Sequence, residues 1–135
     1  MPGGIFPLQL GPHGGVYGGL AFWLGKRTVA GTATYQLFPN GNPFPRSVRV
    51  MGMMGIMTGA GAAADTVQLQ DKDSNAITEA VDVSALSDQD KWDCSVVNDA
   101  YYEIKPGDNL KIATASGALS EVWVQLMLMN SEDLP

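Results

Sequence analysis

Alternation of apolar and polar residues is the feature that most constrains the fold of this chain. From residue 28 onward, short apolar stretches repeat with period two, and clusters of turn-forming residues separate them every 8 to 15 residues. Successive side chains of a β-strand point to opposite faces, so each stretch is typical of a strand with one buried face. No long stretch has a convincing helical period. The sequence therefore predicts an all-β fold built from short strands.

These strands fit a single β-sandwich, and we expect the jelly-roll topology because that fold places about eight strands in two sheets. A chain of 135 residues forms one domain and leaves no room for a second core. We assign residues 26–135 to this β-sandwich domain. The expected strands cover residues 28–37, 47–57, 66–70, 77–83, 92–96, 102–104, 110–112 and 121–129.

Two of the expected strands are apolar on both faces. In residues 47–57, strict alternation places Val48, Val50, Met54 and Ile56 on one face, and residues 121–129 have a similar second stripe. An apolar stripe outside the core is a liability unless something covers it. The arm or a neighbouring subunit can provide this cover, and we expect self-association through the stripes on the non-core faces. These stripes comprise Met51, Met53, Met57, Trp123, Met127 and Met129.

The N-terminal segment, residues 1–25, predicts an extended arm. Its first 20 residues include seven glycines and three prolines, which disfavour regular structure. Its apolar residues are too frequent for a solvated tail. We interpret the arm as a partner-binding segment and leave open whether it meets a capsid, a sister subunit or its own core. The expected anchors are Ile5, Phe6, Leu8, Leu10, Val16, Tyr17, Phe22 and Trp23.

Charge is distributed unevenly along the chain. Residues 1–64 contain four Lys and Arg and no carboxylate, whereas residues 65–135 contain fourteen carboxylates and four lysines. This asymmetry indicates an acidic surface in solvent and a weakly basic, partly apolar surface that meets a partner. The scattered cations do not predict nucleic-acid binding. No apolar stretch is long enough for a membrane helix, no secretory signal is recognisable, and Cys94 is the single cysteine.

Three motifs invite a chemical interpretation, and each has a better structural one. Residues 59–64 match the spacing of a dinucleotide fingerprint with Asp82 beyond it, but the following residues alternate as a strand rather than continuing as a helix. Residues 71–82 have the carboxylate spacing of a calcium loop, yet Ala76 occupies the position that requires glycine. The single histidine, His13, lies among glycines. We predict no catalytic, cofactor-binding or metal-ligating residues and no enzymatic activity.

The glycine-rich arm, the expected strands and the stretch AYYEIKPGDNLKIATASGALSEVWVQLMLM at residues 100–129 together resemble the small all-β decoration or cement proteins of tailed-bacteriophage heads. The resemblance is one of architecture and composition and rests on no diagnostic motif. It implies a structural virion protein that is assembled in the host cytoplasm, binds the major capsid protein on the outer capsid surface and stabilises the capsid. It also implies a homo-oligomer, with a trimer favoured.

A second interpretation stays open at this point. A carbohydrate-binding or receptor-binding β-sandwich of a phage particle would use an aromatic platform near a loop, and Trp92, Tyr101 and Tyr102 are the residues available for one.

Overall fold

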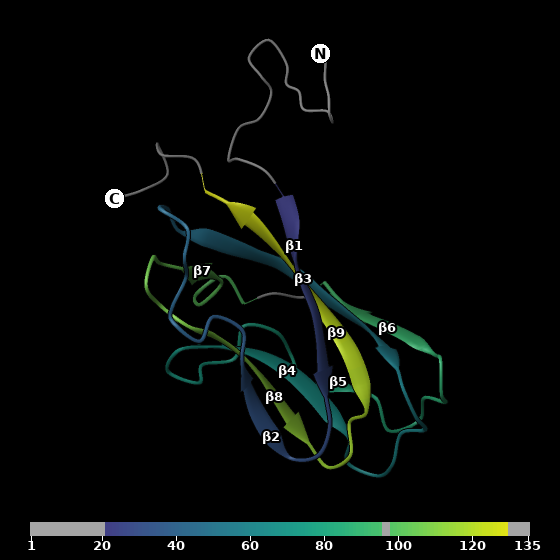
Figure 1. The fold of residues 1–135 in the computed structure, drawn as a ribbon. Coiled ribbons are helices and arrows are strands. Elements are labelled where there is room, and N and C mark those ends of the chain that lie inside the picture. The colour runs from purple at the N-terminus through teal and green to yellow at the C-terminus, as the bar shows by residue number, and fades with distance from the viewer. Residues whose placement is uncertain (1–20, 96–97, 130–135) are drawn as a thin grey trace, which may run out of the picture.

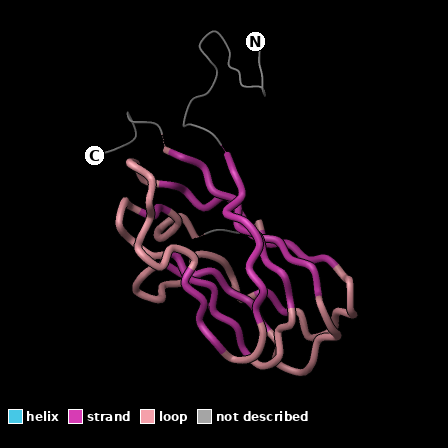
Figure 2. Tube along the Cα trace, viewed as in Figure 1, coloured by secondary structure: helices cyan, strands magenta, loops and turns pink. Residues whose placement is uncertain are grey.

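The computed structural model describes residues 21–95 and 98–129, and it contains only strands and loops in these ranges (Figures 1 and 2). The prediction of an all-β fold is therefore confirmed. The strands are β1 (Ala21–Val29), β2 (Ala33–Gln36), β3 (Val48–Met57), β4 (Thr66–Asp71), β5 (Val81–Asp82), β6 (Lys91–Cys94), β7 (Glu103–Ile104), β8 (Leu110–Ala115) and β9 (Ser120–Leu128).

The strands form two antiparallel sheets. The first has the order β1-β9-β3-β6 with the short β7 also paired to β3, and the second has the order β2-β8-β4-β5. The nested antiparallel pairs β1/β9, β2/β8, β3/β6 and β4/β5 are those of a ribbon of eight strands rolled into two sheets. That is the jelly roll, as predicted, with β7 added between β6 and β8.

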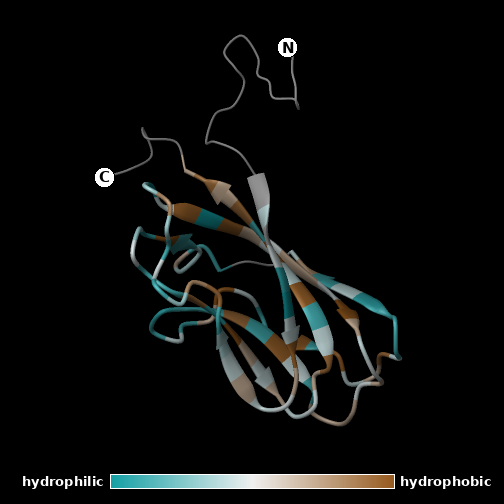
Figure 3. Ribbon diagram, viewed as in Figure 1, coloured by the Kyte–Doolittle hydropathy of each residue, from teal (hydrophilic) through white to brown (hydrophobic). Residues whose placement is uncertain are grey.

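The core lies between the two sheets and is built from one face of each strand. Alternating bands of brown and teal along β4 in Figure 3 show this period directly. The loops at the sheet ends carry the polar residues that turn the chain. Fully buried side chains in the core include Val29, Val48, Val50, Met57, Val67, Leu69, Leu110, Ile112, Val122 and Leu126.

Trp92 of β6 packs across the neighbouring strand β3. Its indole covers Gly55, where a Cβ atom would overlap the ring. The indole Nε1 donates to the Ser120 hydroxyl at 3.2 Å, and this hydroxyl donates in turn to the Met57 sulfur at 3.2 Å. A buried tryptophan needs such an acceptor for its N–H group. Gly55 is therefore required by packing and not by backbone conformation.

A β-bulge in β3 changes which face its later side chains occupy. The register against β9 runs regularly to Val50, which pairs with Leu126, and then shifts so that Gly52 pairs with Gln125. Because one residue is added, the alternation reverses beyond this point. Met53 and Met57 are buried, whereas Met51 is 40% exposed. Our assignment of Met53 and Met57 to the non-core face was wrong.

The N-terminal half of the sandwich also differs from the prediction. The expected strand at 28–37 is divided: the chain leaves the first sheet at Val29 and enters the second at Ala33. Gly31 has φ +70 in the connection, and the Tyr35 hydroxyl hydrogen-bonds both the N–H and the carbonyl of Ala30. At its other end β1 begins at Ala21, so the last five residues of the segment assigned to the arm belong to this strand. Residues 21–23 pair with β9, and the register shifts before Lys26. Residues 1–20 lie outside the described ranges.

Because of the bulge, we predict that truncating two methionines that are two positions apart lowers the free energy of unfolding by very different amounts. Met53→Ala should lower the free energy of unfolding by about 2–5 kcal/mol, because it opens a cavity in the core. Met51→Ala removes a side chain that lies outside the core of the sandwich, so the loss should be clearly smaller, about 1 kcal/mol or less. Urea denaturation of both full-length variants measures the difference. Equal losses, or a larger loss for Met51→Ala, would show that β3 has the unbroken alternation.

Candidate functional site

The outer face of the first sheet carries the most prominent exposed apolar side chains of the described residues. They come from three adjacent strands, and Met54 of β3 lies directly opposite Trp123 of β9. Trp23 of β1, opposite Gln125, is 48% exposed. We call this surface the tryptophan face and define it by the outward-pointing residues Trp23, Met51, Met54, Ile56, Trp123 and Met127.

Two adjoining hollows lie on the tryptophan face. One has a volume of about 290 Å³ and is lined by Trp23, Met54 and Trp123. The other, of about 210 Å³, shares Trp23 and Met54, extends past Met51, and has Asp93 and Gln125 among its polar lining residues. Both are open to solvent and large enough for apolar side chains of a partner. Such a surface is typical of a protein-binding site.

Charged groups of both signs surround this apolar centre. Lys26 and Glu121 form an ion pair at 3.3 Å, which contributes little because both groups are solvated. Asp93 is exposed on β6, opposite Met54. The Arg49 guanidinium lies 4.9 Å from the centre of the Tyr102 ring, and its buried Nε has no hydrogen-bond acceptor. The border therefore has no single sign of charge that would select a strongly charged ligand.

Some of the residues predicted for self-association lie on the outer face of the first sheet, and the others are buried. Trp123, Met127 and Met51 lie on the tryptophan face, whereas Met53, Met57 and Met129 are buried. Of the predicted arm anchors, Trp23 lies on the same face and Phe22 precedes it in β1. The anchors Ile5, Phe6, Leu8, Leu10, Val16 and Tyr17 lie outside the described residues.

Sequence reasoning missed Met54, which it placed on the core face. The signal that marks the change of face is Gly52, because a glycine inside a strand pattern often indicates a bulge. The predicted aromatic platform is not present either. Trp92 is buried beneath the sheet, and the Tyr102 ring is covered by Arg49, which leaves Tyr101 as the exposed member of the three.

The loop that matched a dinucleotide fingerprint has a structural role. It is followed by β4 rather than by a helix, and a Cβ atom at Gly61 would overlap the carbonyl oxygen of Val83. The buried carboxylate of Asp65 accepts hydrogen bonds from the amides of Ala62 at 2.8 Å and Gly117 at 2.6 Å. Burial raises the pKa of Asp65, but these hydrogen bonds outweigh it and hold the pKa below its ordinary value. Asp65 thus joins two loops.

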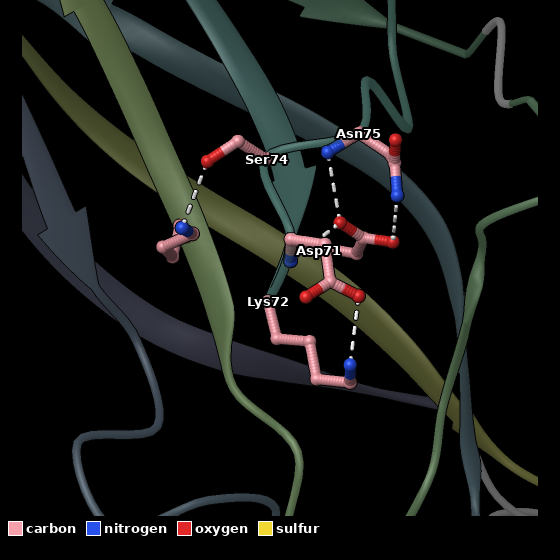
Figure 4. A network of polar contacts seen from close by, with 6 residues as sticks. Asp71, Lys72, Ser74 and Asn75 are labelled. Atoms are coloured by element: carbon pink, nitrogen blue, oxygen red, sulfur yellow. Dashed lines mark hydrogen bonds and ion pairs between the residues drawn. The ribbon is translucent and has the colours of Figure 1, made fainter.

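In the acidic turn after β4, N–H groups of the turn itself hydrogen-bond the Asp71 carboxylate (Figure 4). The Asp71 carboxylate accepts from the amides of Asp73 at 2.9 Å and Asn75 at 2.8 Å, and from the Asn75 side chain at 3.0 Å. Lys72 pairs with Asp73, and Lys111 of β8 donates to Ser74. Within residues 21–95 and 98–129, no three His, Cys, Asp or Glu side chains are grouped to hold a metal ion. The same ranges contain no helix able to cross a membrane.

No family model matches the sequence, and no curated protein is similar to it. Among solved structures, the chain is similar to one from the cyanophage Pam1 capsid asymmetric unit, with a TM-score of 0.53, 16% identity, and coverage of 95% of this chain and 99% of that chain. It also resembles a chain of infectious bursal disease virus, Gt strain, with a TM-score of 0.44, 13% identity, and coverage of 96% and 38%. Of the two, the first is close enough to show a shared fold.

The Asp71 turn predicts that calcium does not stabilise the protein. Both carboxylate oxygens already accept N–H groups, so binding the ion would break hydrogen bonds that hold the turn. The melting temperature should be the same in EDTA and in about 5 mM CaCl₂, a concentration above the roughly 10⁻⁴–10⁻³ M dissociation constants of weak calcium modules. Asp71→Ala should lower the melting temperature in both solutions. Calorimetry checks this. A calcium-dependent rise that Asp71→Ala abolishes would establish an ion site at the turn.

Proposed function

We propose that this protein is a non-enzymatic structural component of a virion that binds the outer surface of the capsid as a decoration protein. The observation that best supports the proposal is the extent of the likeness to the Pam1 capsid chain, which covers 95% of this chain and 99% of the other. A jelly roll matched over nearly the whole of both chains fits a structural component of a particle.

The surface chemistry supports a binding role. The tryptophan face offers exposed Trp and Met side chains and open hollows, which suit the burial of apolar groups from another subunit of a homo-oligomer. The protein has a formal net charge of −6, which repels nucleic acid and fits a position on the outside of a capsid rather than against packaged genome. We propose the major capsid protein as the partner and a homo-oligomer, with a trimer favoured, as the binding unit.

Assembly of particles with and without the protein tests this function. The major capsid protein encoded in the same genome is expressed alone and together with this chain, and particles are separated on a density gradient. A decoration protein should migrate with the particles, should be dispensable for their formation, and should raise the temperature at which they break. The control is an equal amount of an unrelated acidic β-sandwich protein, which should remain at the top of the gradient.

Two outcomes would contradict the proposal. Failure of particles to form without this chain would make it a lattice-forming protein instead of a decoration. Absence from the particle fractions, together with selective binding on a glycan array, would favour a carbohydrate-binding or receptor-binding module.

A further inference from the structure

We propose that the tryptophan face is the docking surface for residues 5–10 of a second copy of this chain, with residues 11–20 as the connector between the two copies. The inference assigns a partner to a surface and does not depend on the virion role. It rests on three properties of the molecule: the apolar character of the face, the absence of charge in residues 1–20, and the position at which that segment joins the sheet.

The face has the form of a site for intermittent apolar anchors. Its two hollows adjoin and share Trp23 and Met54, so a chain that crosses them can place one apolar side chain in each. Gln125, which lines the second hollow, offers a side-chain amide to a crossing backbone. Apolar residues near the start of the chain come in two close pairs, Ile5 with Phe6 and Leu8 with Leu10. In an extended segment Phe6, Leu8 and Leu10 share one side, so they can face the sheet together.

Charge favours this segment over a second sandwich as the occupant. Residues 21–129 contain twelve Asp and Glu against eight Lys and Arg, so two sandwiches that meet face to face bring like net charges together. Residues 1–20 contain no Asp, Glu, Lys or Arg. They can therefore lie across the apolar centre, between the Lys26–Glu121 pair and Asp93, without adding a charge that must lose its water.

The point of attachment favours another copy over the same copy. Residues 1–20 join the sheet at Ala21, and Trp23 follows two positions later, about 7 Å along the strand. The anchors Ile5 to Leu10 precede Ala21 by at least eleven residues. Eleven extended residues reach up to about 36–40 Å, which exceeds the roughly 30 Å diameter of a small domain. For the anchors to dock on the tryptophan face of the same copy, residues 11–20 would have to loop away from Ala21 and return to it. For docking on a second copy, the same residues are the connector between the two copies.

Disulfide trapping between differently tagged chains tests the inference. In a Cys94→Ala background, one chain carries Gln9→Cys, between the anchors Leu8 and Leu10, and a second chain carries Gln125→Cys in the hollow. The matched control replaces Gln68, on the outer side of β4 in the other sheet, by cysteine. After co-expression and mild oxidation, Gln9→Cys should cross-link to Gln125→Cys of the other chain at least tenfold more than to Gln68→Cys.

A single chain that carries both Gln9→Cys and Gln125→Cys separates the remaining cases. Docking on a second copy predicts covalent oligomers of this variant on a non-reducing gel. A monomer with an internal disulfide would overturn the proposal, because it places residues 1–20 on their own sandwich. Equal cross-linking to Gln68→Cys, or no cross-link to either position, would also overturn it.

Discussion

The pairing of β3 with β9 is the interaction on which the rest of the structure depends. The two strands form the centre of the first sheet, and β1, β6 and β7 are held on either side of them. The added residue between Val50 and Gly52 allows β3 to contribute Val48 and Val50 to the core before the bulge, and Met53 and Met57 after it. Without it, strict alternation would turn one half of this strand away from the core.

The bulge also determines the surface. Once Met53 and Met57 point inward, Met54 points outward beside Trp123, and β1 adds Trp23 to the same side. The sheet is therefore packed on one face and apolar at the centre of the other. A monomer in water would pay for this exposure, and a partner that buries the face removes it. The tryptophan face thus follows from the same local feature that completes the core.

Much of the fold could be predicted from sequence because its signals are local. Strands β4, β8 and β9 alternate regularly and are bounded by turn residues. The number and spacing of such strands indicate a β-sandwich, for which the jelly roll is the expected topology, whereas the strand order comes from long-range pairing. Alternation alone could not predict to which side of the sheet Met54 points, because a bulge depends on how β3 pairs with its two neighbouring strands. The burial of Trp92 depends on Gly55, 37 positions earlier, a long-range contact that periodicity does not contain.

The residues of the candidate site that local alternation determines could be predicted, and those that depend on long-range pairing could not. The unbroken alternation of β9 placed Trp123 and Met127 outside the core correctly. Trp23 was assigned to the extended arm, because the glycine-rich residues before it obscure the start of β1. Its position beside β9 comes from strand pairing between the two ends of the described chain, which local patterns do not encode.

The central claim is that the core of the sandwich buries one set of β3 methionines and that a partner segment covers another set. Methionine oxidation, measured for each residue by mass spectrometry, tests this claim. The full-length protein is compared with its Phe6→Ser/Leu8→Ser/Leu10→Ser variant. Our account predicts that Met51 and Met54 are protected in the wild type and oxidised rapidly in the variant, while Met53 and Met57 remain slow in both. Rapid oxidation of Met51 and Met54 in the wild type, or of Met53 in the folded variant, would contradict it.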